Sequence, residues 1–274
     1  MSTGSHWAKM PLRWIHEQGL VNFQGRSPQG VRMFSMLDFV RDADDAPLRN
    51  ESIAALKLYL VLCCQADYRT GLATFTYTDL ESLAVMSRAV ISRSLTRLEA
   101  AQLIKREPQA LKSGSKIQIL AWDDDYAWGK IPKLWLYDGN RGRMLLLKEF
   151  NFSQLSLHAL KIYLTLLAFR DRRGIATLSY DRLVHYTGVL RHQVADAITR
   201  LYDSRLISFR PGEFQSEYEF DRTNRYLVRG FGTRWPSPDD HQAAAEKANA
   251  PGAKMPANKK DIEATLEFVQ DGSR

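Results

Sequence analysis

The chain has 274 residues and a mass of 31.4 kDa, more than one average domain requires, so two domains are expected. An apolar fraction of 45% and a charged fraction of 25% are typical of globular proteins and exclude collagen-like, mucin-like and wholly disordered classes. The net charge is +7, and because residues 236–274 contain 5 basic and 7 acidic side chains, the preceding residues carry +9, which favours an anionic partner.

One stretch of the sequence occurs twice. Residues 55–62 read ALKLYLVL and residues 159–166 read ALKIYLTL, and after one deletion the match continues to residues 104 and 207. The alignment has 19 identities in 49 pairs, where unrelated sequences would give roughly 3, so the chain is interpreted as a tandem duplication. We call residues 31–121 copy one and residues 144–235 copy two.

Each copy is predicted to contain three helices and three strands. An apolar helix with helical spacing of Leu, Ile and Tyr comes first, followed by an aspartate and a glycine that stop it. A short strand, a short helix, a turn, a third helix and two strands joined by a loop follow. The predicted ranges in copy one are 53–66, 73–77, 78–84, 87–101, 103–106 and 117–121, and those in copy two are 157–170, 176–180, 181–186, 190–204, 206–210 and 217–220. Ser87 is expected to be the N-cap of the third helix in copy one.

The remaining segments are less regular. The N-terminal arm, residues 1–30, is expected to form a short helix over 7–19, with Pro11 near its start. Strands are predicted at 33–40 and 144–148, before the repeated helices, and at 133–137 within a linker of residues 122–143. The tail, residues 236–274, is rich in Ala, Pro, Asn and charge and is expected to be disordered, with one amphipathic stretch at 259–269 for a protein partner.

The order of these elements is that of a winged helix, so the predicted fold is mainly α with small β-wings, in two tandem winged-helix (helix-turn-helix) domains at 31–121 and 144–235. Residues 86–104, MSRAVISRSLTRLEAAQLI, resemble the recognition helix of GntR- and MarR-type winged-helix DNA-binding domains. The resemblance lies in Ser-Arg at the helix start, an apolar residue at Ile91, Ser94-Leu95, and Leu-Glu before a closing Leu-Ile. Copy two departs from it at Leu190 and Asp196.

A winged helix on duplex DNA places the first half of its third helix in the major groove. Positions opposite the inward stripe of Ile91, Leu95 and Leu98 are therefore the candidate DNA contacts. In copy one these are Ser87, Arg88, Ala89, Ser92 and Arg93, and in copy two they are Arg191, His192 and Gln193. Arg88 or Arg93 suits guanine and Gln193 suits adenine, whereas Asp196 repels phosphate.

The wings and the late helix positions supply further candidates. The first wing contains Lys105, Arg106, Lys112, Ser113 and Lys116, a flexible basic loop suited to a phosphate backbone. The second wing combines Arg210 with three glutamates, so copy one is expected to provide more of the phosphate affinity. Arg97 in copy one and Arg200 in copy two occupy equivalent positions late in the third helix. A phosphate contact and a structural salt bridge are equally compatible with the sequence at both positions.

Other chemistry finds little support in the sequence. Cys63 and Cys64 align with Leu167 and Ala168, which favours buried packing over redox or metal chemistry, and Tyr59 and Tyr163 are expected in the core. The histidines lack paired ligand spacing, residues 123–125 are read as a solvated Asp-rich loop, and no Walker-type phosphate loop is present. We therefore expect no enzyme activity, metal or cofactor.

The leading hypothesis is a sequence-specific double-stranded DNA-binding protein with two recognition helices on one chain. Its role would be transcription regulation or replication initiation, since the two-domain layout resembles replication initiators of plasmids and phages. The alternative is a protein-binding tandem winged-helix scaffold, as in chromosome-segregation complexes. No apolar run reaches a membrane-spanning length and no secretory signal is visible, so we expect a cytoplasmic protein that does not bind membranes. A DNA-binding role would associate it with the nucleoid, as a monomer or a homodimer.

Overall fold

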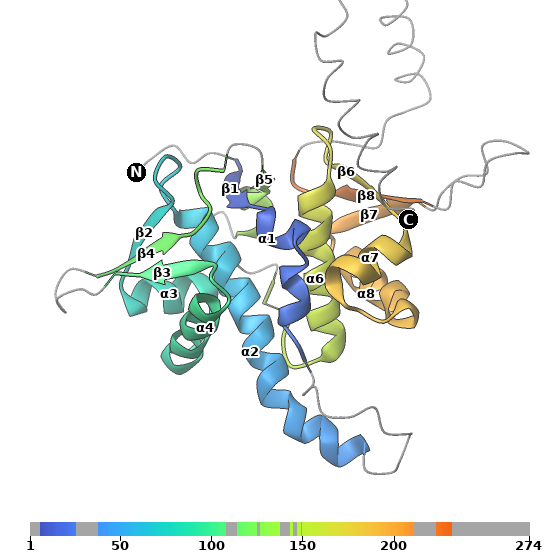
Figure 1. The fold of residues 1–274 in the computed structure, drawn as a ribbon, viewed down its shortest axis with the longest axis horizontal. Helices are drawn as coiled ribbons and strands as arrows, with labels where there is room; N and C mark the ends of the chain where they lie inside the picture. Colours follow the sequence, from blue (N-terminus) through green and yellow to red (C-terminus); the bar gives the residue numbers. More distant parts are fainter. Residues whose placement is uncertain are drawn as a thin grey trace, which may run out of the picture. The chain divides into compact units, whose positions relative to one another are not determined.

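The two segments that repeat in the sequence also repeat one order of helices and strands (Figure 1). The computed structural model describes residues 6–25, 38–107, 114–124, 127–137, 143–144, 147–148, 150–210 and 223–231. Copy one contains α2 (Asp38–Gln65), β2 (Leu72–Phe75), α3 (Tyr77–Ala84), α4 (Arg88–Ala100), β3 (Ile104–Arg106) and β4 (Ser115–Ile119). Copy two contains α6 (Gln154–Phe169), β6 (Ile175–Leu178), α7 (Tyr180–Thr187), α8 (Arg191–Asp203), β7 (Ile207–Arg210) and β8 (Asn224–Val228).

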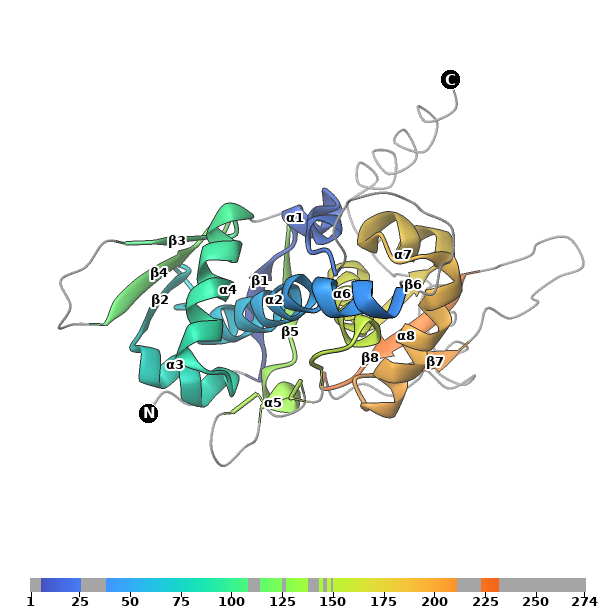
Figure 2. The same cartoon turned by 90° about the horizontal axis from the view of Figure 1, so that it is seen from below.

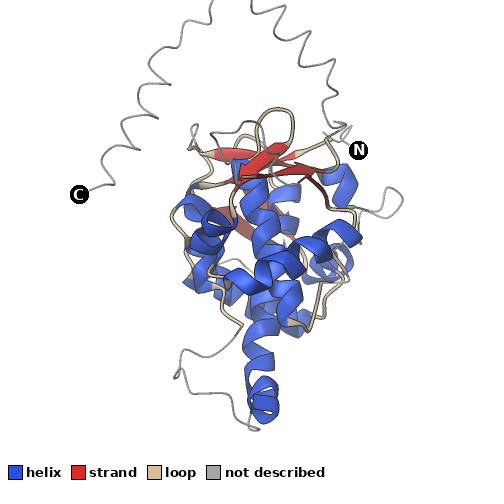
Figure 3. Ribbon diagram, turned by 90° about the vertical axis from the view of Figure 1, so that its right-hand side faces the viewer, coloured by secondary structure: helices blue, strands red, loops and turns tan. Residues whose placement is uncertain are grey.

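The sheets of the two copies have the same strand order. Copy one has the antiparallel sheet β2-β4-β3 and copy two has the antiparallel sheet β6-β8-β7, so in each the last strand of the copy lies in the centre. About half of the described residues are helical, and the strands gather toward one side of the described part (Figure 3). At this level the predicted fold class is confirmed: helices combined with small antiparallel sheets.

The second helix of each copy begins with the same kind of cap. In copy one the Thr76 hydroxyl accepts from the Asp79 backbone N–H at 3.2 Å and the Asp79 carboxylate accepts from the Thr76 backbone N–H at 2.8 Å. The hydrogen bonds that the Thr76 backbone N–H and hydroxyl donate to the carboxylate hold the pKa of Asp79 below its ordinary value. In copy two the Ser179 hydroxyl accepts from the Arg182 N–H at 3.3 Å. Both caps satisfy N–H groups that a helix start leaves unpaired, which explains the sharp start of α3 and α7.

The glycines that follow the first helix of each copy are required by the backbone. Gly71 has φ +69° and Gly174 has φ +82°, a left-handed conformation that suits glycine. A Cβ atom on Gly71 would also lie 2.4 Å from the Trp122 ring. The preceding aspartates form the turn, because Oδ1 of Asp67 accepts from the Thr70 N–H at 2.9 Å and Oδ1 of Asp171 accepts from the Arg173 N–H at 2.8 Å. The predicted stop signals are confirmed.

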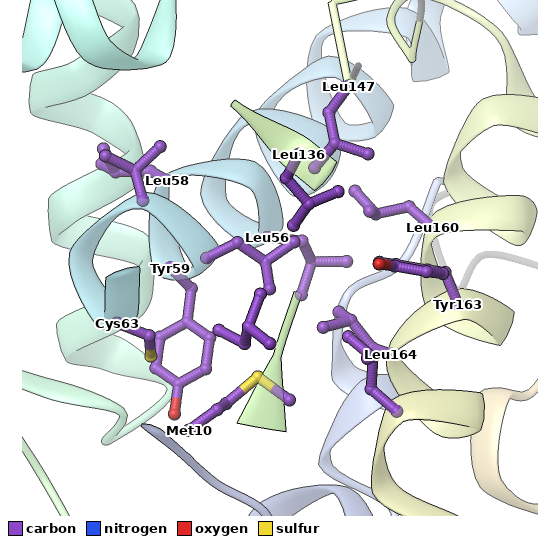
Figure 4. Packing of buried hydrophobic residues seen from close by; sticks show 14 of the residues in the cluster. Met10, Leu56, Leu58, Tyr59, Cys63, Leu136, Leu147, Leu160, Tyr163 and Leu164 are labelled. Atoms are coloured by element: carbon purple, nitrogen blue, oxygen red, sulfur yellow. The ribbon is translucent and has the colours of Figure 1, made fainter. Parts of the chain in front are cut away.

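The two copies share one hydrophobic core. α2 packs against α6, and the equivalent residues Leu56 and Leu160 point into the layer between them together with Leu136 and Met10 (Figure 4). Tyr59 and Tyr163 are fully buried, as predicted, and Cys63 and Cys64 are buried as well. Burial raises the pKa of both thiols, Cys64 to about 12, which keeps them protonated and unreactive at neutral pH.

The arm and the linker pair with each other, which corrects two predictions. The arm was expected to be helical over 7–19, but it contains β1 (Ala8–Pro11), α1 (Arg13–His16) and a 3-10 turn at Gly19–Asn22. The linker strand expected at 133–137 is instead β5 (Trp128–Ile131), and Lys133–Leu136 forms the short helix α5. β1 pairs with β5 from Ala8–Ile131 to Pro11–Trp128. Pro132 provides no N–H for a ladder and follows the strand directly, so it ends β5 there.

Two further strand predictions differ from the structure, and a third lies outside the described residues. Residues 38–40 of the predicted strand 33–40 belong to α2, and residues 33–37 lie outside the described residues. Within 144–148 the described residues form no strand. The second wing strand, predicted at 217–220, falls on residues that are not described, and β8 lies further along the chain. The predicted tail, 236–274, also lies outside the described part, including its stretch 259–269. No helix in the described part of the chain is both long and apolar enough to cross a membrane.

Candidate nucleic-acid interface

α4 separates an inward face from an outward face in the way its sequence predicts. Ile91, Leu95 and Leu98 are buried against the core, with exposed fractions of at most 3%. The candidate contact residues lie on the other face. Ser87, Arg88, Ala89 and Arg93 are exposed, and Ser92 is half-buried. The helical period of 3.6 residues places these positions on one side, so their side chains are available to a ligand that covers the first half of α4.

The start of α4 is held by residues that the sequence analysis missed. Ser87 occupies the N-cap position, but its side chain makes no capping hydrogen bond, which corrects the expected role. The Arg88 backbone N–H is instead bound by Oε1 of Glu81 from α3 at 3.0 Å. The Arg88 guanidinium lies over the Tyr77 ring, 4.6 Å from its centroid. Tyr77 recurs as Tyr180 in the repeat, which was the available signal.

Arg93 lies where α4 meets α2. It lines a pocket together with Val90 of α4 and with Pro47, Asn50 and Glu51 of α2. The predicted contact residue therefore borders a carboxylate-bearing stretch of its own chain. This neighbourhood was not visible from sequence, because α2 was predicted to begin only at residue 53.

The late arginines of the third helices both lie over a phenylalanine. Arg97 donates to the Asn22 carbonyl oxygen at 3.2 Å and lies 5.6 Å from the Phe23 ring centroid. Burial lowers the pKa of Arg97, partly offset by Glu51. Arg200 lies 5.4 Å from the centroid of the Phe150 ring. Each arginine thus joins its helix to the segment that precedes a repeated helix, and a structural role accounts for the presence of both.

The structure describes only some of the candidate DNA contacts in the first wing. Lys105 is exposed on β3 and Lys116 is half-buried on β4, whereas Lys112 and Ser113 lie outside the described residues. Arg106 forms an ion pair with Glu99 of α4, with Nε 2.7 Å from Oε2. That hydrogen bond lowers the pKa of Glu99 and raises the pKa of Arg106. Arg106 is therefore already engaged with a carboxylate, whereas Lys105 and Lys116, the other described basic groups of this wing, form no ion pair with another described residue.

In copy two the same helix face carries different chemistry. Arg191 is exposed and forms an ion pair with Asp181 of α7. His192 is exposed and Gln193 is half-buried, with its backbone N–H bound to the Leu190 carbonyl oxygen at 2.8 Å. Asp196 is also exposed, so the outward face of α8 is less basic than that of α4.

The second wing brings two arginines together. Arg210, predicted as a contact, is exposed at the end of β7 and pairs in register with Arg225 of β8. Arg229, directly after β8, donates from Nε to the Ser208 hydroxyl at 3.0 Å. The three glutamates predicted for this wing lie outside the described residues. The described base of the wing is therefore positive.

The two third helices lie toward opposite ends of α2 when the molecule is seen from below (Figure 2). In the described part of the chain no group of three His, Cys, Asp or Glu side chains is placed to bind a metal ion. Within the acidic loop predicted at 123–125, Asp124 lies 3.0 Å from Nε of Arg13. That contact gives this loop a structural role between the arm and the linker.

A comparison of the chain with protein-family models finds no matching family, and a comparison with curated proteins finds no significantly similar sequence.

Proposed function

We propose that this protein binds double-stranded DNA through two winged helices on one chain. The observation that carries the proposal is the repeated unit itself. In each copy a third helix with an exposed first half is followed by two paired strands, β3 and β4 or β7 and β8. A helix of this kind fits the major groove, and a loop between two strands fits the backbone beside it.

Charge supports a polyanionic partner. The residues before the tail carry a net charge of +9, and Arg88, Arg93 and Lys116 lie on the third helix and wing of copy one. Positive groups that neutralise phosphates release bound counterions, which provides affinity without base contacts. In the proposed complex Arg88 and Arg93 approach base edges, and Lys105, Lys112, Ser113 and Lys116 approach phosphates.

The two copies would cover adjacent half-sites without dimerisation. Because Ser92 and Arg93 in α4 correspond to Ala195 and Asp196 in α8, the two half-sites would differ in sequence. We propose either transcription regulation or initiation of replication of a plasmid-like or phage-like element as the role of this binding. Genome-wide immunoprecipitation separates these roles, since initiation gives a peak beside an origin and regulation gives peaks at promoters.

The test is a titration of fluorescently labelled random-sequence duplex DNA with the full chain at several salt concentrations. We expect the logarithm of the association constant to fall linearly with the logarithm of salt concentration, by about 0.9 for each phosphate neutralised. A selected duplex should then bind tighter than the random pool. Absence of binding, or affinity that does not change with salt, would contradict the proposal.

A protein partner for copy two is the second candidate function. The surface of α8 favours it, because Leu190 is 57% exposed and Tyr202 is 55% exposed while Arg191 is already paired with Asp181. Exposed apolar groups beside a compensated charge fit a protein surface better than a phosphate backbone. Leu190→Ser and Tyr202→Ser would abolish such an interaction and leave DNA affinity unchanged.

A further inference from the structure

The antiparallel ribbon of β1 and β5 joins the two copies (Figure 1). β1 packs against α2, and β5 packs against α6. Residues of a strand point alternately to opposite faces, and on one face of the ribbon Ala8, Met10 and Ile131 are buried in the shared core. The ribbon lies outside the repeated helices and strands, so the duplication does not account for the side chains on its other face.

The other face of the ribbon combines two tryptophans with two lysines. Lys9 and Lys130 lie directly opposite each other in the ladder. Trp7 and Trp128 each precede one of these lysines by two residues, so they lie on the same face. Their rings are stacked, with centroids 5.8 Å apart and planes at 23°. The Lys130 ammonium lies 4.4 Å from the Trp7 ring centroid, so the rings and the cation form one surface.

Copy one adds a tyrosine to this surface. Tyr68, in the turn after α2, packs edge-on against Trp7, with ring centroids 5.8 Å apart, and is 55% exposed. Its backbone is held in place because its carbonyl oxygen accepts from Nε1 of the buried Trp122 at 2.9 Å. The equivalent residue of copy two is Arg172, so this tyrosine belongs to copy one alone. We call Trp7, Tyr68, Trp128 and Lys130 the aromatic platform.

Lys9 is buried behind the aromatic platform. Its exposed fraction is 8%, and its ammonium lies 5.9 Å from the Tyr68 ring centroid, 5.4 Å from that of Trp122 and 5.7 Å from that of Trp128. Like charges directly opposite each other in a sheet repel, and neither Lys9 nor Lys130 forms an ion pair with another described residue. The rings offset part of this repulsion, and the platform remains positively charged.

An unpaired DNA strand fits this combination of groups. Aromatic rings stack on the faces of bases, and cations beside the rings neutralise the phosphates. In a duplex those faces are covered by the neighbouring base pairs, so protein rings stack on bases that are splayed out of a helix. An apolar protein surface would cover two ammonium groups without neutralising them, which costs free energy. The chemistry of the platform therefore favours a single strand over a duplex or an apolar protein partner.

We propose that the aromatic platform is a binding site for single-stranded DNA. Bases stack on Trp7, Tyr68 and Trp128, and Lys130 contacts a phosphate. The site lies on the ribbon and not on the third helices or the wings. The inference therefore goes beyond the duplex binding proposed above and does not depend on it.

The test is an anisotropy titration of a labelled deoxythymidine strand with the full chain at low salt. Tyr68→Ala/Lys130→Gln removes an exposed ring and a cation of the platform, so affinity for the strand should fall about tenfold. The matched control Tyr202→Ala/Lys133→Gln changes a tyrosine of equal exposure and another half-buried lysine. It should bind the strand as the wild type does. All three proteins should bind a random-sequence duplex with affinities that agree within about twofold.

Two further variants separate stacking from folding. Tyr68→Phe retains the ring and should bind the strand as the wild type does. Bases stacked on Trp7 and Trp128 should quench tryptophan fluorescence, and Trp7→Phe/Trp128→Phe should reduce that quenching while affinity falls only slightly. Circular dichroism and urea unfolding establish that each variant is folded.

The outcomes distinguish this site from the duplex site. Equal losses of strand affinity in the platform variant and its control would overturn the platform, as would complete displacement of the strand by unlabelled duplex. Tighter binding of a uridine RNA of the same length would overturn DNA as the bound strand. Binding of duplex without binding of the strand would refute the platform and leave the proposed function intact, whereas binding of the strand alone would contradict the proposed function and leave the platform.

Discussion

The two copies have the same fold but different surfaces. In copy one the Arg88 guanidinium lies over the Tyr77 ring, whereas its equivalent Arg191 forms an ion pair with Asp181. The residue that corresponds to Asp181 in copy one is Thr78, which has no charge. A single difference on the second helix therefore decides whether the arginine on the third helix forms an ion pair. This comparison shows that equivalent residues at equivalent backbone positions need not be equally available to a ligand.

The residues that remain identical between the copies mostly have structural partners. Arg97 and Arg200 both lie over phenylalanine rings, and Lys57 and Lys161 are both buried. Lys57 donates to the Phe150 carbonyl oxygen at 3.3 Å, and Lys161 donates to the Thr187 carbonyl oxygen at 3.0 Å. Internal identity thus mostly marks packing in this protein. Apart from Arg88 and Arg191, the outward positions at the start of α4 and α8 have diverged, and a binding difference should be sought there.

The largest expected effect is a difference in DNA affinity between variants of α4 and variants of α8. Arg88→Ala/Arg93→Ala/Lys112→Ala/Lys116→Ala removes the basic groups of copy one and should weaken specific DNA binding by about 1,000-fold, since each good base contact contributes about 1 to 3 kcal/mol. Arg191→Ala/His192→Ala/Gln193→Ala in copy two should weaken it by about tenfold, because Arg191 is already paired. Anisotropy titrations measure both, and equal losses would refute the ranking of the copies.

Because the two copies share one core, we expect cavities at equivalent positions to lower the free energy of unfolding by equal amounts. Leu98 in α4 and Leu201 in α8 are both fully buried, so Leu98→Ala and Leu201→Ala should each lower the free energy of unfolding by about 3 kcal/mol. Urea unfolding followed by circular dichroism should show one transition in each variant, because the packing of α2 against α6 joins the copies. Two separated transitions would show that the copies unfold independently.

Lys161 predicts a pH dependence of stability. Burial lowers the pKa of Lys161 to about 8, while the unfolded lysine binds its proton up to its ordinary value of 10.5. Between these values the unfolded state binds more protons, so the contribution of Lys161 to the free energy of unfolding rises with pH. From pH 8 to pH 10 that rise is about 2 kcal/mol.

The buried thiols act in the opposite direction, because Cys63 and Cys64 keep their protons in the folded state. The measurement is therefore the difference between wild type and Lys161→Met in urea unfolding at pH 8, 9 and 10. The difference should grow with pH in favour of the wild type. A difference that stays constant would show that Lys161 titrates normally in the folded protein. Lys57→Met should behave alike, since burial lowers the pKa of Lys57 to about 8 as well.

The smallest effect is expected from exchanging the residues at positions 78 and 181, which distinguish the surroundings of Arg88 from those of Arg191. Asp181→Thr frees Arg191 and should strengthen DNA binding about threefold, whereas Thr78→Asp places a carboxylate at the equivalent position near Arg88 and should weaken it about threefold. The pair Arg191–Asp181 is exposed, which limits the change. Shifts in the same direction for both variants would contradict the assigned role of Asp181.

The sequence alone determined the repeated part of the fold. Helical spacing of apolar residues located α2, α4, α6 and α8, and the Asp and Gly positions predicted the turns, because these signals depend on neighbours within a few residues. The inward stripe of α4 and the exposure of Ser87, Arg88, Ala89 and Arg93 followed from the same period. Local physical chemistry was sufficient for these features.

Only the tertiary structure decided the features that depend on distant partners. β1 and β5 pair across more than a hundred residues, so the arm and linker could not be predicted from either segment alone. In the structure Arg106 pairs with Glu99, Arg191 pairs with Asp181, and Arg97 binds the arm. The structure also shows that α2 begins earlier than its sequence predicts. Whether a basic side chain is available depends on which groups the fold brings within a few ångströms of it, and sequence spacing does not contain that distance.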